Sequence, residues 1–141
     1  PGLGYTVNLP LPPGAGDGSF SYLLAEVIEP LVGSYRPQLV LLSAGYDAHW
    51  RDPLANLRAT LPGLDHLVQR ALALADEHCQ GRLVAVLEGG YDLEVLGAGV
   101  ANLAEVLLGT PERCQDPVGA SPLPAADELE HLEALKRGFL G

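Results

Sequence analysis

Hydrophobic residues fall into two patterns along the chain. In residues 39–42 (LVLL) and 82–87 (RLVAVL) they are almost continuous over a short run. Such runs are typical of strands in a parallel sheet that is covered on both faces. Elsewhere they recur every three or four residues, which predicts amphipathic helices from about residue 19 to 30, and over 61–80, 93–108 and 127–139. With a further short strand predicted over residues 5–9, this alternation of strand and helix predicts an α/β fold.

Turn and capping residues set the expected ends of these elements. Ser19 is the expected N-cap of the first helix, and Pro30 should kink or end it. Thr60 should cap the helix of residues 61–80, with Pro62 in its first turn and Gly81 as its terminator. Residues 110–126 are rich in Pro, Gly and Asp and are predicted to form a loop.

Polar residues follow both predicted strands directly. The first strand leads into Tyr46, Asp47 and His49, and the second leads into Glu88-Gly-Gly-Tyr91-Asp. In open parallel sheets, ligands bind beyond the carboxyl ends of the strands. A right-handed crossover between the two strands would set Asp47 and Tyr91 on the same edge of the sheet. The sequence therefore predicts a functional site at that edge.

These residue types suit metal and oxyanion chemistry. Asp47 and His49 form an Asp-x-His pair that could give two ligands to a zinc ion. Alternatively, Asp47 caps a turn and His49 faces solvent. Gly89 and Gly90 allow a backbone path closed to other residues and close approach by a ligand. Tyr91 could donate its phenolic proton to an oxygen that gains charge during a reaction, or it could simply cover the end of the sheet.

Composition narrows the class of protein. The 141 residues carry a formal net charge of −10 and are 48% hydrophobic, which suits one folded domain and opposes binding to nucleic acid or to anionic lipid. No leader pattern or membrane-length apolar run is present, and Cys79 and Cys114 are expected to be reduced in a cytoplasmic protein. His66 and His78 fall on or near the solvated side of the predicted helix 61–80 and are assigned no role, and His131 has no chemical neighbour in sequence. The loop GAGDG has no Lys and does not form a nucleotide-binding fingerprint.

The motifs LVLLSAGYDAHWRDPL and LVAVLEGGYDL, preceded by NLPLPPGAGD, closely resemble the carboxyl-terminal half of the catalytic domain of the histone deacetylase family. The resemblance is greatest to class II-like members, acetoin-utilisation proteins and acetylpolyamine amidohydrolases. It covers residues 1–109 with specific motifs, and the loop 110–126 and the helix 127–139 more loosely. It implies an incomplete three-layer, arginase-like α/β fold with a parallel sheet.

The resemblance also implies a zinc-dependent amidohydrolase acting on acetylated lysine or acetylated polyamines. By this resemblance Asp47 is a zinc ligand, Tyr91 stabilises the tetrahedral oxyanion, and Gly89 and Gly90 shape the substrate channel. His49 matches no ligand position of the family. The rim of the channel is then expected to include Tyr46, His49 and Trp50.

The family's upstream Asp-x-His metal motif and its paired catalytic histidines are absent from these 141 residues. We therefore expect a fragment that is inert without the upstream half of the same domain, as the opening without Met also suggests. A truncated module that acts in binding or assembly, such as a homo-oligomer, is the alternative. The family's potassium sites would also lie upstream. Asp52, in the WRDPL turn, is expected to cap backbone donors and not to bind metal.

Overall fold

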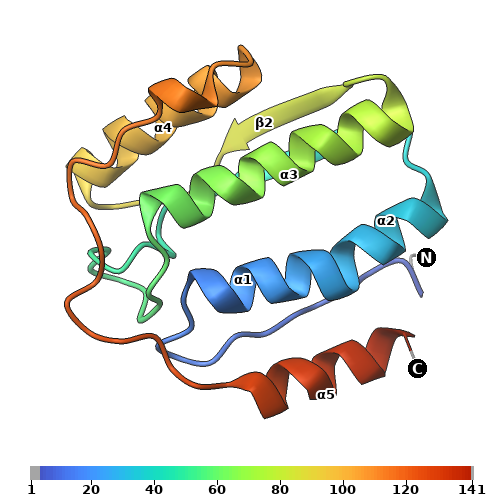
Figure 1. The fold of residues 1–141 in the computed structure, drawn as a ribbon, viewed down its shortest axis with the longest axis horizontal. Helices are drawn as coiled ribbons and strands as arrows, with labels where there is room; N and C mark the ends of the chain where they lie inside the picture. The colour runs from blue at the N-terminus through green and yellow to red at the C-terminus, as the bar shows by residue number, and fades with distance from the viewer. Residues whose placement is uncertain (1–3, 141) are drawn as a thin grey trace.

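The computed structural model describes residues 4–140 of the chain and has an α/β architecture (Figure 1). A two-stranded sheet is accompanied by helices that come before, between and after its strands. The elements in order are α1 (Asp17–Leu23), the π-helix η1 (Leu24–Ile28), α2 (Glu29–Tyr35), β1 (Val40–Ala44), α3 (Leu61–Cys79), β2 (Leu83–Leu87), α4 (Leu93–Leu107), the 3-10 helix η2 (Pro111–Arg113) and α5 (Leu129–Leu140).

Strands β1 and β2 pair in parallel, in the order β1-β2, with Val40 opposite Leu83 and Ala44 opposite Leu87. Helix α3 makes the crossover between them. The predicted strand–helix–strand–helix unit is therefore confirmed. Because Ala44 and Leu87 are the last residues of their strands, both carboxyl ends lie at the same edge of the sheet.

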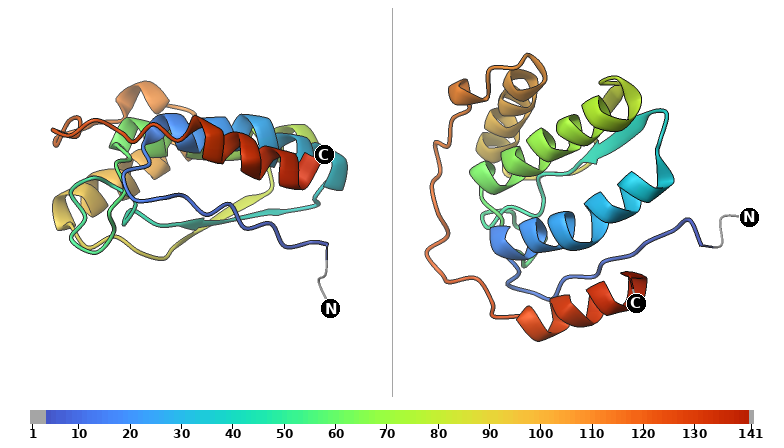
Figure 2. Two further views of the ribbon diagram at one scale, coloured as in Figure 1. Left: turned by 90° about the horizontal axis from the view of Figure 1, so that it is seen from below. Right: turned by 45° about the vertical axis from the view of Figure 1, so that its right-hand side comes forward.

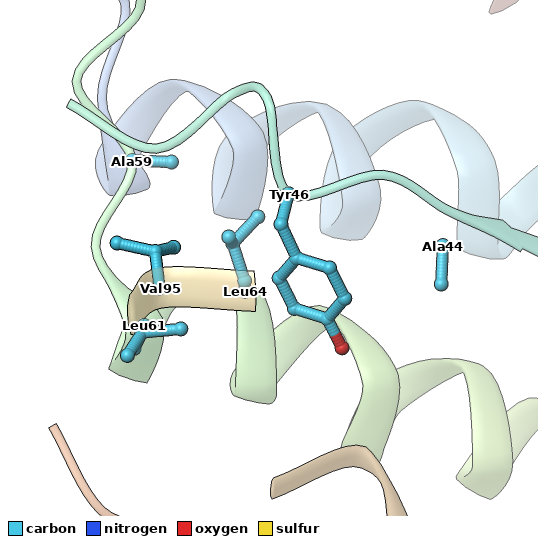
Figure 3. Close-up of a cluster of buried hydrophobic side chains, with 6 residues drawn as sticks. All are labelled: Ala44, Tyr46, Ala59, Leu61, Leu64 and Val95. Atoms are coloured by element: carbon cyan, nitrogen blue, oxygen red, sulfur yellow. The ribbon is translucent and has the colours of Figure 1, made fainter. Parts of the chain in front are cut away.

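The main core lies where α3 and α4 meet the carboxyl ends of the strands. Its buried members come from the strand end, the loop that follows it and the two helices, and Figure 3 shows their side chains converging between these elements. They are Ala44, Tyr46, Ala59, Leu61, Leu64 and Val95. The core therefore holds in place the segment that carries the predicted site.

Thr60 caps α3 as expected, because its side chain accepts a hydrogen bond from the backbone N–H of Gly63 at 3.2 Å. Asp17 accepts hydrogen bonds from the backbone N–H and the hydroxyl of Thr60, at 2.8 and 2.7 Å. The start of α1 is thereby tied to the start of α3. Gln80 ends α3 in the left-handed conformation, followed by Gly81 at φ +72°.

Helices α1, α2, α3 and α5 lie in one layer on the same side of the sheet (Figure 2, left). The opposite face carries Leu41, Val84 and Val86, which are 71%, 48% and 51% exposed. Within residues 4–140 the sheet is therefore covered on one face only. This corrects the expectation of two covered faces: the continuous apolar runs have the composition of a fully buried sheet, but the described residues provide only one covering layer.

Three local predictions also need correction. Residues 5–9 form no strand, because no neighbouring strand among the described residues pairs with them, and Tyr5 is 77% exposed. The first helix begins at Asp17 with Gly16 as its N-cap, while Ser19 is buried inside it. Pro30 does not end the helical stretch. It lies in the first turn of α2, directly after the π-helical turn of η1, and the helix continues to Tyr35.

Helix α5 packs on α1 and η1. Leu132 is buried against Leu23 and Val27. Polar contacts also join α5 and the residue before it to the first helices. Ser19 Oγ donates to Glu128 Oε1 at 2.9 Å, and Lys136 Nζ pairs with Glu26 Oε2 at 2.6 Å. None of the helices described here is both long and apolar enough to cross a membrane.

Candidate functional site

The loops after β1 and β2 run side by side beyond the sheet. The backbone N–H of Glu88 donates to the carbonyl of Ala44 at 3.0 Å, and the N–H of Tyr46 donates to the carbonyl of Gly89 at 2.8 Å. The ladder of the parallel strands therefore continues into the polar segments. This brings together the two motifs that the sequence placed at one edge.

Two glycines keep these loops close. A Cβ atom on Gly89 would lie 3.1 Å from Cγ and from Oδ2 of Asp47. Gly90 has φ +127°, and a Cβ atom there would lie 2.8 Å from Cβ of Tyr46. Gly90 thus adopts a backbone conformation that other residues rarely reach. Both glycines allow the second loop to pass directly beside the first.

Asp47 and Tyr91 lie on these adjacent loops with side chains that reach solvent. The Asp47 side chain is partly exposed, and its carboxylate lies against the space beside Gly89. Tyr91 is 56% exposed. The described residues thus present a carboxylate and a phenol just beyond the ends of the paired strands.

Asp52 connects the first loop to the second. Its side chain is only 6% exposed. Oδ1 accepts a hydrogen bond from the backbone N–H of Leu54 at 2.9 Å, and Oδ2 accepts one from the backbone N–H of Tyr91 at 2.8 Å. The predicted capping of local backbone donors is confirmed by the first bond. The second bond, across to the other loop, was not predicted.

Arg51 makes a second connection between the loops. Its guanidinium donates to Asp92 Oδ2 through Nε at 2.9 Å and to Glu94 Oε2 through Nη1 at 3.0 Å. Asp92 is also the N-cap of α4, where it accepts from the N–H groups of Glu94 and Val95. The hydrogen bond from Val95 is the main cause that lowers the pKa of Asp92, with Arg51 adding to it. The start of α4 is therefore fixed to the loop after β1.

The structure corrects the expected rim positions of Tyr46 and His49. Tyr46 is 3% exposed, and its hydroxyl donates to the carbonyl of Gly99 on α4 at 2.7 Å. In Figure 3 its ring points into the core and away from the loop. Burial, together with the negative charge of Asp65, raises the pKa of Tyr46 to about 12. Tyr46 is therefore a core residue that anchors the loop carrying Asp47.

His49 is fully buried beside Trp50. Its Nδ1 accepts from the backbone N–H of Arg51 at 3.2 Å, and among the described residues Nε2 has no hydrogen-bond partner. Burial lowers the pKa of His49. Trp50 is partly buried and donates from Nε1 to the carbonyl of Gly119 at 2.9 Å. Sequence reasoning overestimated the exposure of this loop because most residues of the run DAHWRD are polar.

Sequence reasoning also missed a buried carboxyl group. Asp65 of α3 is 5% exposed and accepts a hydrogen bond from Nδ2 of Asn102 on α4 at 2.7 Å. Burial is the main cause that raises the pKa of Asp65 to about 6. Asp65 follows Leu64 and lies three residues before Val68, which puts it on the apolar face of the helix. That position could have indicated from the sequence that the carboxyl group is buried.

Comparison with known proteins identifies the family. The sequence model named "Histone deacetylase domain" matches residues 1–107. The chain belongs to the histone deacetylase family. It is 52% identical over 93 residues to a probable deacetylase of Archaeoglobus fulgidus, an alignment that covers 66% of this chain and 26% of that protein. It is 42% identical over 143 residues to a chloroplastic histone deacetylase 10 of rice, an alignment that covers 95% of this chain and 32% of the rice protein.

Similarity extends to the human polyamine deacetylase HDAC10, which is 37% identical over 136 residues, covering 96% of this chain and 19% of the human protein. Among solved structures, the HD domain of HDA15 superposes with a TM-score of 0.74 at 28% identity. It covers 99% of this chain, which spans 34% of that structure. The expected deacetylase-like fold is thus confirmed for part of a deacetylase domain, and the chain spans between a fifth and a third of these relatives.

Membership of this family implies a catalytic zinc ion, and the described residues fit one part of such a site. No group of three or more His, Cys, Asp or Glu side chains within residues 4–140 is arranged to hold a metal ion. Asp47, however, presents a carboxylate beside a glycine, where a Cβ atom would crowd it. Carboxylate oxygen is a normal zinc ligand, and a catalytic zinc site needs three protein ligands. Asp47 therefore fits the chemistry of one ligand of such a site.

Proposed function

We propose that this chain forms the carboxyl-terminal part of the active site of a zinc-dependent deacetylase, which hydrolyses the amide bond of acetylated lysine or of an acetylated amine. The observation that carries the proposal is the pairing of β1 and β2, which puts Asp47 and Tyr91 on adjacent loops at one edge of the sheet. A carboxylate for the metal and a hydrogen-bond donor for the substrate are both needed at such a site.

Each residue then has a defined task. Asp47 would hold the zinc ion together with ligands from the rest of the domain, and a zinc ion there would supply Lewis-acid polarisation of the amide carbonyl and a more acidic water. Tyr91 donates a hydrogen bond from its phenol to the carbonyl oxygen as negative charge develops there. Its exposure of 56% leaves the hydroxyl free to face a substrate. Gly89 and Gly90 keep the two loops close, because a Cβ atom at either position would crowd Asp47 or Tyr46.

Proton transfer is assigned to residues outside this chain. A histidine must take a proton from the attacking water and give one to the leaving amine. His49 is fully buried, so its ring is not presented to a substrate at the surface. His66 is exposed on α3, and no hydrogen bond among the described residues joins it to either loop. The chain by itself is therefore expected to be inactive.

The substrate class follows from the relatives and from charge. One relative is named a histone deacetylase and another a polyamine deacetylase. Acetylated lysine in a protein and acetylated polyamines share an acylated primary amine within a cationic molecule. The net charge of −10 is compatible with both.

The test is complementation. Zinc content and hydrolysis of a fluorogenic acetyl-lysine peptide are measured for the 141-residue chain alone and with the upstream half of the domain added in trans. We expect zinc and activity only in the mixture. Stoichiometric zinc and turnover in the isolated chain would contradict the proposal that ligands are missing.

Two substitutions in the complete enzyme test the residue roles. Asp47→Ala should abolish tight zinc binding. Tyr91→Phe should keep zinc and lower kcat by roughly 10²–10³, the usual cost of removing one oxyanion donor. Full activity of the Tyr91→Phe enzyme would refute the role given to the phenol.

The second candidate function is a catalytically inert module that binds a partner or assembles with itself. The apolar face formed by Leu41, Val84 and Val86 favours it, because an uncovered sheet face is a ready contact surface. Analytical ultracentrifugation decides between the two. A stable oligomer of the chain that persists without zinc, combined with failure of complementation, would favour the module over the enzyme.

A further inference from the structure

We infer that Asp52 is a positioning residue that sets the place of Tyr91 relative to Asp47. The inference rests on the function proposed above and adds to it a residue that touches neither metal nor substrate. Asp52 lies on the loop after β1, five positions beyond Asp47, and its carboxylate reaches across to the loop after β2.

The contact is short and shielded from water. Asp52 Oδ2 accepts from the backbone N–H of Tyr91 at 2.8 Å, and the Asp52 side chain is 6% exposed. A hydrogen bond from a backbone N–H to a carboxylate is stronger than a neutral one, and shielding from water strengthens it further. The Tyr91 amide is therefore firmly attached to the first loop.

The other oxygen makes Asp52 a rigid link. Oδ1 accepts from the N–H of Leu54 at 2.9 Å, and the N–H of Asp52 itself donates to the carbonyl of His49 at 2.9 Å. Since His49 is fully buried, the base of the link is anchored in the core. Asp52 thus transfers the position of the buried loop to the Tyr91 backbone.

The bond to Asp52 acts on Tyr91 itself, whereas the second connection between the loops, from Arg51, holds the next residue, Asp92. Tyr91 is 56% exposed, so few contacts fix its ring. It follows Gly90 at φ +127°, a residue whose backbone has unusual freedom. The direction of the phenol is then set mainly by the backbone at residue 91. Loss of the anchor should displace the hydroxyl without removing it.

Asp52→Asn is the sharpest perturbation because it keeps size and shape. An ionised carboxylate accepts from both N–H groups, whereas an amide offers one oxygen and turns its NH₂ donors toward the other N–H. One of the two contacts, to Leu54 or to Tyr91, is therefore lost in the variant. Asp52→Ala, which removes both acceptor oxygens, is measured beside it so that the Tyr91 contact is broken in at least one of the two variants.

The experiment is a double-mutant cycle in the full-length, zinc-loaded enzyme with an acetyl-lysine peptide. Asp52→Asn should lower kcat by about 10- to 100-fold, the cost of misplacing a reacting group by up to ~1 Å, with KM and zinc content unchanged. In the Tyr91→Phe background the same substitution should lower kcat by less than about twofold, because the displaced hydroxyl is already gone. Equal losses in both backgrounds would overturn the inference, as would unchanged kcat in both Asp52→Asn and Asp52→Ala.

Asp17→Asn is the matched control. Asp17 also accepts two hydrogen bonds, from the N–H and the hydroxyl of Thr60, but it joins α1 to the start of α3, and these bonds go to neither Asp47 nor Tyr91. It should leave kcat within about twofold even if it lowers the thermal midpoint as much as Asp52→Asn does. A comparable loss of kcat in this control would show that general weakening of the fold, and not the position of Tyr91, lowers turnover.

Hydrogen exchange at the Tyr91 amide separates this inference from the proposed function. The amide should be protected in the wild type and exchange at least about tenfold faster in Asp52→Asn, whether or not the enzyme is active. Unchanged exchange in both Asp52→Asn and Asp52→Ala would refute the link itself. A wild type that binds zinc but hydrolyses no acetylated amine would refute the proposed function, and accelerated exchange in the variant would then still establish that Asp52 positions Tyr91.

Discussion

Gly99→Ala tests the packing that anchors the loop of Asp47. A Cβ atom on Gly99 of α4 would lie 2.2 Å from Cε1 of Tyr46, which is 1.2 Å less than the 3.4 Å at which ordinary contact begins. The ring cannot easily move away, because Tyr46 is 3% exposed and its hydroxyl donates to the carbonyl of Gly99 itself. The substitution therefore forces either the ring or α4 to shift.

The expected cost follows from these contacts. Overpacking of a core typically costs 1–3 kcal/mol, and disruption of the Tyr46 hydrogen bond adds about 1 kcal/mol. Replacing Gly by Ala inside a helix returns up to about 1 kcal/mol. Gly99→Ala should therefore destabilise the protein by about 2 kcal/mol. Urea unfolding followed by circular dichroism measures this difference.

Gly97→Ala is the matched control on the same helix. No atom lies within 4 Å of a Cβ atom at Gly97, so only the helix-propensity gain remains, and the variant should be stabilised by about 0.5–1 kcal/mol. The two substitutions, two residues apart, should therefore change the free energy of unfolding in opposite directions, which indicates that the contact with the Tyr46 ring causes the loss at Gly99. Equal effects at both positions would refute the packing argument, as would an unchanged cost of Gly99→Ala in a Tyr46→Leu background.

Two other groups give predictions of the same kind. Because the pKa of Asp65 is raised to about 6 from 3.8, the folded state holds a proton that the unfolded state releases, and stability should fall as pH rises from about 4 to 6. The shift of about two units corresponds to roughly 3 kcal/mol, so Asp65→Asn should remove this pH dependence and stabilise the protein at pH 7.5. Unfolding curves at pH 4 and 7.5 check it, and parallel profiles for variant and wild type would contradict it. Thr60→Ala removes the N-cap of α3 and one partner of Asp17, and should cost about 1 kcal/mol in the same urea assay, whereas no loss would show that the cap does not hold α3.

Much of the fold was predictable because it depends on local pattern. The continuous runs at β1 and β2, the three- and four-residue spacing of α3 and α4, and the cap at Thr60 all correspond to elements of the structure. The parallel pairing that brings Asp47 and Tyr91 to one edge also followed from the order of elements.

What the sequence could not show depends on contacts between distant segments. His49 is buried because Ala59 pairs with its backbone and Trp50 packs beside it, and neither contact is visible in the local pattern. The bond from Tyr91 to Asp52 spans 39 positions. Residues 5–9 have the composition of a strand, but a strand requires a hydrogen-bonding neighbour, and composition does not supply one.

The one-sided sheet has a consequence for how the isolated chain behaves in solution. Strand edges and the apolar face of Leu41, Val84 and Val86 attract further copies, while the charge of −10 on each molecule keeps copies apart. Charge repulsion is screened by salt and disappears near the isoelectric point, but the apolar attraction is not screened. Light scattering by the chain should therefore rise with added salt and with acidification. This part of a deacetylase should accordingly stay dispersed on its own at low salt and at a pH well above its isoelectric point.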